Sequence, residues 1–230
     1  MAGEDITIQA SDGSGGFMAY LSPPAGGAPG PGVIMCHEIF GVTPWIRETA
    51  DLFAAHDYCV VAPDMFWRMK PGFVGDHTSG EDTAEGRDYK ARIDYPKAME
   101  DLQACMDMLK ARGDCNGKVA ITGFCTGGTL AYLAAGQLDL EAAAPYYGTN
   151  IHNFYDEGRN IKCPTILHHG HADDRVPEDL PQRLAEAVAD VPNAEVLVYD
   201  AGHAFANSHR PEDYYVEAAA KLAHQRTFEL

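Results

Sequence analysis

Val119-Ala-Ile-Thr-Gly-Phe-Cys-Thr-Gly-Gly128 is the stretch of this sequence that decides its fold. Its first four residues, 119–122, are apolar or β-branched and predict a short buried strand. A pentapeptide of the form Gly-x-Cys-x-Gly follows over 123–127, and the alanine- and leucine-rich run after it predicts a helix over 129–135. Two glycines therefore flank Cys125 at a sharp turn between a strand and a helix.

The strand, the glycine-flanked turn and the helix match the nucleophile elbow of α/β-hydrolases, with cysteine where serine is usual. Small neighbours are needed because the elbow residue has a strained backbone and the strand and helix approach closely. The helix directs its free N–H groups and the positive end of its dipole at Cys125. That field favours the thiolate, the reactive form of cysteine. The alternative is a packed turn with a buried, inert cysteine, and residues further along the chain decide between the two.

Length and composition fit a single α/β domain over residues 1–230. Hydrophobic residues make up 46% of the chain and charged residues 22%, as in ordinary soluble proteins with a sizeable core. There is no apolar run of membrane-spanning length and no signal-peptide pattern, so we expect a cytoplasmic protein without membrane contact. The formal net charge of −17 argues against nucleic acid as a partner and repels anionic substrates at long range.

Cysteines and histidines do not form a metal-binding pattern. The six cysteines are scattered without a CxxC pair, which argues against a disulfide framework and a structural zinc site. The densest group of histidines, His168-His169-Gly-His171, is expected at the end of a strand, where neighbouring side chains point to opposite faces. We therefore expect no metal ion there.

Apolar runs and helical periodicity alternate along the chain. Strands are expected over 6–10 and 17–22 as a hairpin, and then over 32–37, 58–62, 119–122, 142–147, 164–168 and 194–199. Further helices are expected over 45–56, 96–112, 178–189 and from 211 to about 226. Residues 65–92 are expected to form a long irregular excursion. This alternation predicts an α/β fold whose mostly parallel sheet has helices on both faces.

Two later strands are each followed by a candidate catalytic residue. Asp173 follows the strand over 164–168, and His203 follows the strand over 194–199. Cys125, Asp173 and His203 thus occur in the order nucleophile, acid, histidine that α/β-hydrolases use. Each lies beyond the carboxyl end of a strand, where ligands bind in parallel sheets. Asp174 is a rival acid, although the spacing to the following Val-Pro favours Asp173.

The sequence resembles the dienelactone hydrolase (carboxymethylenebutenolidase) family over nearly the whole chain. The motifs that carry the resemblance are the cysteine elbow, His37-Glu-Ile-Phe-Gly41, Ala-Pro-Asp64, Tyr146-Tyr-Gly148 and Gly202-His203-x-Phe205. It implies the α/β-hydrolase fold and hydrolysis of a small lactone or ester through a cysteinyl thioester. It also implies that no cofactor takes part. Beyond a small-molecule substrate we expect no partner other than further copies, in a monomer or small homo-oligomer.

The resemblance implies a role for each matching residue. Cys125 attacks the carbonyl, and His203, hydrogen-bonded to Asp173, moves the proton. Glu38 is implied to face the thiol and to help deprotonate it.

Residues around these groups are implied to hold the substrate. Backbone N–H groups of Ile39 and Thr126 would stabilise the oxyanion. Phe40 and Tyr147, which lie in the matching motifs, are candidate substrate-binding residues.

The sequence departs from the family where the charge of a substrate would be recognised. Family members that act on dienelactone hold its carboxylate with arginine and with a serine near the catalytic histidine, but residues 204–207 here are Ala-Phe-Ala-Asn. Arg68 and Arg87 are candidates for that cation, or are exposed arginines on an acidic surface. Dienelactone is therefore open as a substrate. The alternatives are a carboxylesterase of broader specificity and a non-catalytic or redox-sensing member of the fold.

Overall fold

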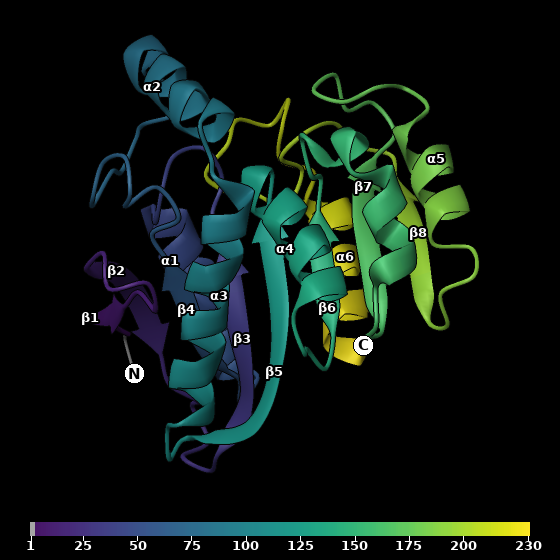
Figure 1. Ribbon diagram of the computed structural model, residues 1–230. Coiled ribbons are helices and arrows are strands. Elements are labelled where there is room, and N and C mark those ends of the chain that lie inside the picture. The colour runs from purple at the N-terminus through teal and green to yellow at the C-terminus, as the bar shows by residue number, and fades with distance from the viewer. Residues whose placement is uncertain (1–2) are drawn as a thin grey trace. The chain divides into compact units, whose positions relative to one another are not determined.

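The computed structural model describes residues 3–230, and a division between Ala120 and Ile121 separates two compact units. Strands and helices alternate in both units, the first drawn in purple to teal and the second in teal to yellow (Figure 1). Strand β5 (Cys115–Phe124) begins in the first unit and ends in the second. It contains the predicted strand over 119–122.

The first unit holds a hairpin and two parallel strands. β1 (Glu4–Gln9) pairs antiparallel with β2 (Gly16–Ser22), and β2 pairs antiparallel with β4 (Cys59–Pro63). β4 in turn pairs parallel with β3 (Gly30–Cys36). All five residues of β4 are buried, as expected for an apolar strand with neighbours on both sides.

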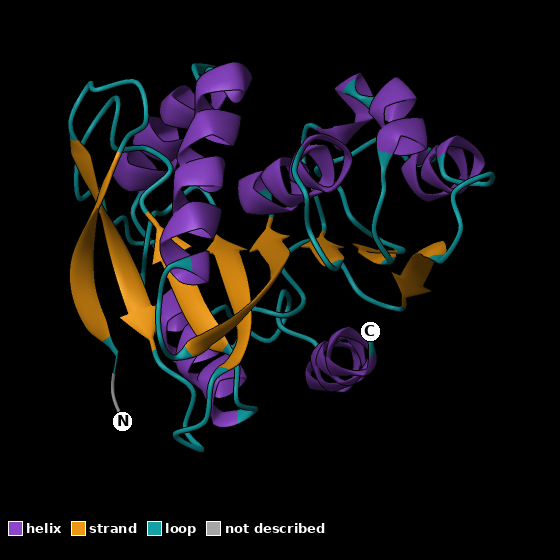
Figure 2. Ribbon diagram, turned by 60° about the horizontal axis from the view of Figure 1, so that its bottom comes forward, coloured by secondary structure: helices purple, strands orange, loops and turns teal. Residues whose placement is uncertain are grey.

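Two helices cover opposite faces of these strands, as Figure 2 shows. α1 (Pro44–Ala55) begins at Thr43, whose side chain accepts the Ile46 N–H, and its first residue is a proline that fits the helical backbone. α3 (Tyr95–Lys110) begins at Asp94, whose side chain accepts the Lys97 N–H, and buries its apolar face. Both helices lie within two residues of their predicted bounds.

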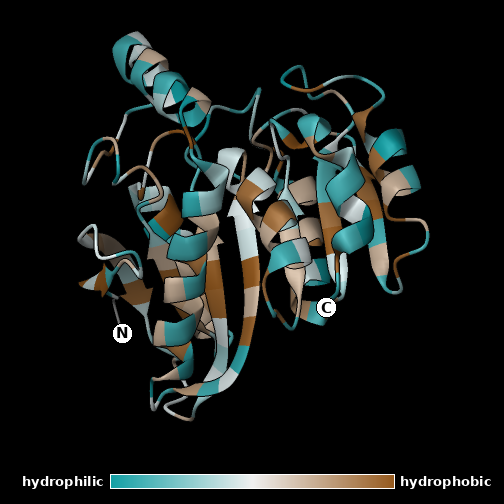
Figure 3. Cartoon of the chain, in the orientation of Figure 1, coloured by the Kyte–Doolittle hydropathy of each residue, from teal (hydrophilic) through white to brown (hydrophobic). Residues whose placement is uncertain are grey.

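The region expected to be irregular, 65–92, contains the helix α2 (Gly80–Ala91). Ser79 caps its N-terminus by accepting the Asp82 N–H, and two acidic residues occupy its first turn. Most residues along this helix are coloured hydrophilic (Figure 3). Only Gly86 and Tyr89 are buried, and Tyr89 packs on Phe66 and Phe73.

The second unit is a run of parallel strands. β5 pairs with β6 (Ala143–Tyr146), β6 with β7 (Thr165–Gly170) and β7 with β8 (Ala194–Tyr199). Phe124 lies opposite Tyr146, and Tyr146 opposite His168. The carboxyl ends of β5, β6 and β7 are thereby brought to one edge, and the residues that follow them are placed together.

Helices cover both faces of this unit as well. α4 (Thr126–Gln137) and α5 (Leu180–Ala187) lie on one side of the strands, and α6 (Glu217–Glu229) lies on the other (Figure 2). Two short 3₁₀ helices, Ile151–Asn153 and Tyr155–Asn160, follow β6. A mostly parallel arrangement with helices on both faces is thus confirmed.

The prediction that the last helix begins at Pro211 is wrong. Residues 211–215 form a turn in which the N–H groups of Tyr214 and Tyr215 both donate to the Pro211 carbonyl. The N–H of Val216 then donates to the Phe205 carbonyl, 3.1 Å away. Because this hydrogen bond ties residue 216 to a distant loop, helical hydrogen bonding begins only afterwards, at Glu217.

A buried polar network joins α6 to the strands of the second unit. Thr227 donates to a carbonyl of its own helix, so its oxygen accepts from the Tyr146 hydroxyl at 2.6 Å and from His168 Nε2 at 3.0 Å. His168 Nδ1 then accepts from the Tyr199 hydroxyl at 2.8 Å, and His224 Nδ1 donates to Tyr146 at 3.1 Å. Burial holds the pKa of His168 well below its ordinary value and lowers that of His224 to about 4. Both imidazoles are therefore neutral.

Among residues 3–230, no helix is long and apolar enough to cross a membrane.

Candidate active site

Cys125 lies at the turn between β5 and α4 with φ of +57° and ψ of −113°. Its N–H donates to the Tyr146 carbonyl at 3.1 Å, and its own carbonyl accepts the Gly128 N–H at 3.1 Å. A Cβ atom on Gly128 would lie 2.3 Å from the Tyr146 carbonyl oxygen, so only glycine allows α4 to pack this closely on β6. The sharp turn expected from the sequence at Cys125 is therefore present, and it requires glycine at position 128.

The Cys125 side chain is buried, with 6% of the residue exposed. It lies at the N-terminus of α4, where the helix dipole stabilises negative charge. Two hydroxyl groups flank its sulfur: Thr149 Oγ1 at 3.9 Å and Thr126 Oγ1 at 4.0 Å. Thr149 was not among the residues expected from the sequence. It reaches the sulfur because it lies three residues beyond Tyr146, the register partner of Phe124.

His203 and Asp173 are joined by a hydrogen bond of 2.8 Å between Nδ1 and Oδ2. The other carboxylate oxygen of Asp173 accepts the Arg175 N–H at 2.9 Å, which fixes the carboxylate in its loop. Asp174, the rival acid, instead points its exposed side chain at the Arg175 guanidinium. Of the two adjacent acids, the structure brings Asp173 to the histidine.

The loops after β7 and β8 are bound to one another, and this sets the position of both side chains. The Ala172 N–H donates to the Ala201 carbonyl at 2.9 Å. A Cβ atom on Gly170 would lie 2.5 Å from that carbonyl oxygen, so the approach requires glycine at this position. These contacts place the loops of Asp173 and His203 side by side.

His203 is buried, with 8% of the residue exposed, and nearby charges determine whether its imidazole is protonated. Burial opposes the charged imidazolium, but the nearby Cys125 sulfur, which is also a hydrogen-bond partner, and the Asp173 carboxylate stabilise it. Together they raise the pKa of His203 to about 10.

Tyr147, a candidate substrate-binding residue, is fully buried and packs its ring edge-on against His203, with centroids 5.1 Å apart.

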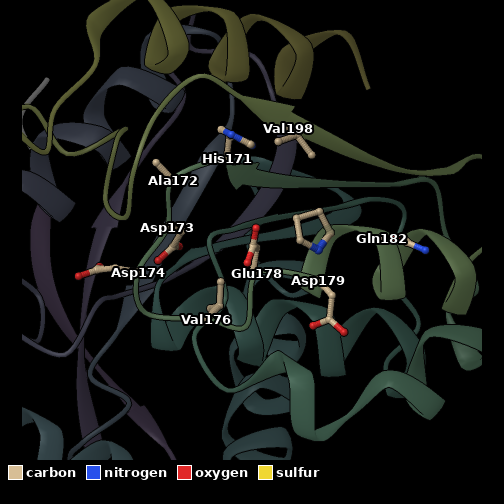
Figure 4. A pocket seen from close by; sticks show the side chains of 10 residues that line it. His171, Ala172, Asp173, Asp174, Val176, Glu178, Asp179, Gln182 and Val198 are labelled. Atoms are coloured by element: carbon tan, nitrogen blue, oxygen red, sulfur yellow. The ribbon is translucent and has the colours of Figure 1, made fainter.

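A cavity of about 580 Å³ lies between the Asp173 loop and the start of α5 (Figure 4). Besides Asp173 it is lined by the carboxylate-bearing residues Asp174, Glu178 and Asp179. Neither Cys125 nor His203 lines it. Its acidic wall is unsuited to anionic substrates.

In the first unit, the candidate residues Glu38, Ile39 and Phe40 form a turn directly after β3. The Gly41 N–H donates to the Glu38 carbonyl, and Glu38 and Phe40 are each 5% exposed. A Cβ atom on Gly86 would lie 2.1 Å from the Ile39 carbonyl oxygen, so α2 packs directly on this turn.

The two candidate arginines differ in their surroundings. Arg68 donates to both carboxylate oxygens of buried Asp101 at 2.9 and 2.7 Å, donates to Asp12 at 3.1 Å and stacks on Trp67. With its guanidinium held by two carboxylates, Arg68 is suited to a structural role. Arg87 lies on α2 and is exposed to solvent.

Cys36, the cysteine that ends β3, is poorly suited to redox partnership with Cys125. All six cysteines are free and buried. Burial raises the pKa of the fully buried Cys36 thiol far above its ordinary value, which suppresses the thiolate needed for disulfide exchange. Among residues 3–230, no three His, Cys, Asp or Glu side chains form a group that could hold a metal ion.

Parallel strands with a cysteine at a strained strand–helix turn, and with an acid and a histidine after later strands, define the chain as an α/β-hydrolase. A family model described as "Dienelactone hydrolase family" matches residues 17–230. The chain belongs to the dienelactone hydrolase family.

Relatives of known name agree with this assignment. A carboxymethylenebutenolidase of Pseudomonas sp. (strain P51) is 32% identical, with all of this chain and 95% of the relative covered. A carboxymethylenebutenolidase of Pseudomonas putida is 33% identical over 98% of this chain and 94% of its own. Among solved structures, a candidate dienelactone hydrolase of Klebsiella pneumoniae superposes with a TM-score of 0.84 at 25% identity, covering 100% of this chain and 98% of the other.

Proposed function

We propose that this family member hydrolyses a small lactone or ester through a thioester on Cys125. The observation that carries the proposal is the grouping of Cys125, His203 and Asp173 within one compact unit, with the histidine hydrogen-bonded to both other residues. A buried imidazolium beside a sulfur at a helix N-terminus is the arrangement that generates a nucleophilic thiolate.

In the first half of the reaction, the Cys125 sulfur attacks the carbonyl carbon and the carbonyl electrons move to the oxygen. The N–H groups of Thr126 and, by family resemblance, Ile39 stabilise this oxyanion. When the oxyanion collapses, the carbon–oxygen bond of the ester breaks and His203 gives its proton to the departing oxygen. The product of this half is a thioester on Cys125.

In the second half, His203 takes a proton from water, whose oxygen attacks the thioester. The carbon–sulfur bond then breaks, which releases the acid and restores the thiolate and imidazolium. Asp173 holds the imidazole in the tautomer that both halves require. By family resemblance, Glu38 assists when the thiol must be deprotonated.

The relatives' names point to a lactone as the substrate class. We propose Arg87 as the candidate ligand for a substrate carboxylate, because the guanidinium of Arg68 is already bound by Asp101 and Asp12. Phe40 and Tyr147 are proposed to shape the acyl site, Tyr147 through its contact with His203. A cytoplasmic location and a monomeric or small homo-oligomeric state remain predictions.

The test is removal of the thiol. Cys125→Ala should abolish hydrolysis of aryl esters and lactones, and mass spectrometry of the wild-type protein quenched during turnover should find the acyl group on Cys125. Cys163→Ala is the matched control, since Cys163 is also buried in the second unit but lies outside the site. Near wild-type turnover in Cys125→Ala would show that the proposed mechanism is wrong.

A further inference from the structure

His37 lies directly after β3 and is 1% exposed, so its ring is enclosed by protein. The ring packs edge-on against Phe66, with centroids 4.9 Å apart. The mechanism above assigns it no part. Burying an imidazole costs less free energy when its nitrogens are hydrogen-bonded, and both nitrogens of His37 have a partner.

The hydrogen bonds of His37 determine where its proton lies. Nε2 is 2.9 Å from the backbone nitrogen of Met65, and an N–H group can only donate. Nε2 therefore carries the lone pair, and the proton is on Nδ1. Nδ1 lies 2.5 Å from the Glu38 carbonyl oxygen and donates to it. Consistent with this neutral form, burial lowers the pKa of His37, although Asp64 opposes the shift.

The carbonyl that His37 binds belongs to the same peptide unit as the N–H of Ile39. In a trans peptide, the C=O and N–H groups point in opposite directions within one plane. The Glu38 oxygen also accepts the Gly41 N–H at 3.4 Å, but the bond from His37 is the shorter of the two. This shorter bond holds the Glu38 oxygen and therefore the direction of the Ile39 N–H. Donation to the carbonyl also polarises the amide and strengthens its N–H as a donor.

We infer that His37 is a positioning residue that aims and polarises the Ile39 N–H for stabilisation of the oxyanion. This inference rests on the proposed function, in which Ile39 supplies one of the two oxyanion donors. His37 itself does not contact the reacting atoms in this proposal, because it acts through the Glu38–Ile39 peptide.

The turn that contains Met65 holds His37 in place, and Asp64 shapes this turn. Asp64, which is 1% exposed, accepts the N–H groups of Phe66 at 2.9 Å and Gly72 at 2.8 Å. These bonds shape the turn that presents the Met65 N–H to Nε2. Asp64 thus shapes the turn at Met65, this turn holds the imidazole of His37, and the imidazole holds the Glu38 carbonyl.

The experiment compares His37→Asn with His37→Leu. Asparagine and leucine have similar size and branching, and both lack an acceptor placed like Nε2, so both lose the Met65 hydrogen bond. Only asparagine keeps an N–H placed like Nδ1 that can donate to the Glu38 carbonyl. A general loss of structure therefore lowers the activity of both variants alike, while loss of the carbonyl contact affects leucine alone.

We expect kcat for an aryl ester to be about tenfold lower in His37→Leu than in His37→Asn, with similar KM, since removal of an oxyanion donor outright costs about 100-fold or more. The Ki of a substrate-like aldehyde, whose hemithioacetal with Cys125 bears the oxyanion, should rise by a similar factor. The Ile39 amide resonance should move in His37→Leu and much less in His37→Asn.

Equal kcat and equal aldehyde Ki in the two variants would overturn the role of His37 and leave the proposed function standing. A wild-type protein without Cys125-dependent hydrolysis would overturn the proposed function, and with it the catalytic purpose of this contact. The two failures are distinguishable because hydrolysis by the wild type and by Cys125→Ala is measured before the His37 variants are compared.

Discussion

Cys125 and His203 are coupled through charge within a buried environment. Burial alone would leave His203 neutral at pH 7, because a protonated imidazole loses hydration there. The sulfur of Cys125 and the carboxylate of Asp173 reverse this preference and raise the pKa to about 10. The direction of this pKa shift matters for the proposed mechanism, in which protonated His203 is the acid that gives its proton to the departing oxygen.

This coupling predicts how His203 titrates. In the wild type, the imidazole should stay protonated as the pH is raised from 7 to 9, because its pKa is about 10. In Cys125→Ala the strongest stabilising charge is gone, so His203 should lose its proton at a distinctly lower pH. The measurement is an NMR titration of the His203 ring, with Cys163→Ala as the control that should titrate like the wild type. An unchanged titration in Cys125→Ala would contradict the coupling.

α4 packs closely on β6, and two glycines of α4 make it possible to test how much this close contact matters. A Cβ atom on Gly128 would lie 2.3 Å from a backbone oxygen, whereas one on Gly136 meets its nearest atom at 3.3 Å. Gly128→Ala should therefore lower the free energy of unfolding by at least about 2 kcal/mol and reduce kcat, because the helix that follows the proposed nucleophile Cys125 is displaced. Gly136→Ala should stay within about 1 kcal/mol of the wild type, since alanine favours the helix.

Urea denaturation and ester hydrolysis of the two variants test this. The expectation fails if the two alanine variants are equally stable and equally active.

The network around Thr227 predicts how firmly α6 is held. Thr227→Val keeps the shape of the side chain but removes the oxygen that accepts from Tyr146 and His168. A buried donor without an acceptor costs about 1–3 kcal/mol, so the variant should lose about 2 kcal/mol of stability in urea denaturation. Thr227→Ser, which keeps the hydroxyl, should lose much less. Equal losses of stability in Thr227→Val and Thr227→Ser would show that packing, and not the hydroxyl, accounts for the change.

Predictability from the sequence differed among the elements for physical reasons. Strands such as β8 were predicted accurately, because an apolar run between turn residues has few alternatives. α2 was missed because it buries only Gly86 and Tyr89 and so shows no apolar stripe. The start of α6 was misplaced because a tertiary hydrogen bond at Val216 sets it.

Site residues divide in the same way. The order and position of Cys125, Asp173 and His203 along the chain pointed to the residues that the second unit brings together. The hydroxyl of Thr149 was not foreseen, since its approach to the sulfur depends on the pairing of β5 with β6. The contacts of Arg68 were equally invisible, because its partners Asp101 and Asp12 are distant in sequence.

For the whole molecule, 34 acidic residues against 17 basic ones give a net charge of −17. This field repels anionic substrates at long range and is screened by salt, with a Debye length of about 10 Å at 0.1 M. We therefore expect kcat/KM for an anionic lactone or ester to rise with ionic strength between roughly 0.01 and 0.15 M. The value for a neutral ester of the same acyl group should stay nearly constant.

Arg87→Gln separates local recognition from this bulk effect. If Arg87 binds a substrate carboxylate, the variant should raise KM for the anionic substrate by about tenfold to a hundredfold and leave the neutral ester nearly unchanged. Salt dependence should persist in the variant, because one charge in a total of this size is small. Equal effects on both substrates would assign Arg87 a structural role.

The strained backbone of Cys125 implies a trade-off between the stability of the protein and its proposed chemistry. A non-glycine residue with φ of +57° costs roughly 1–3 kcal/mol, a penalty that glycine escapes. A library of variants selected only for stability at high temperature should therefore accumulate glycine at position 125 and lose the proposed nucleophile. The same trade-off is useful in experiments. Cys125→Gly is expected to have a higher free energy of unfolding and no ester hydrolysis, so that an intact ester can be captured in its complex with the protein.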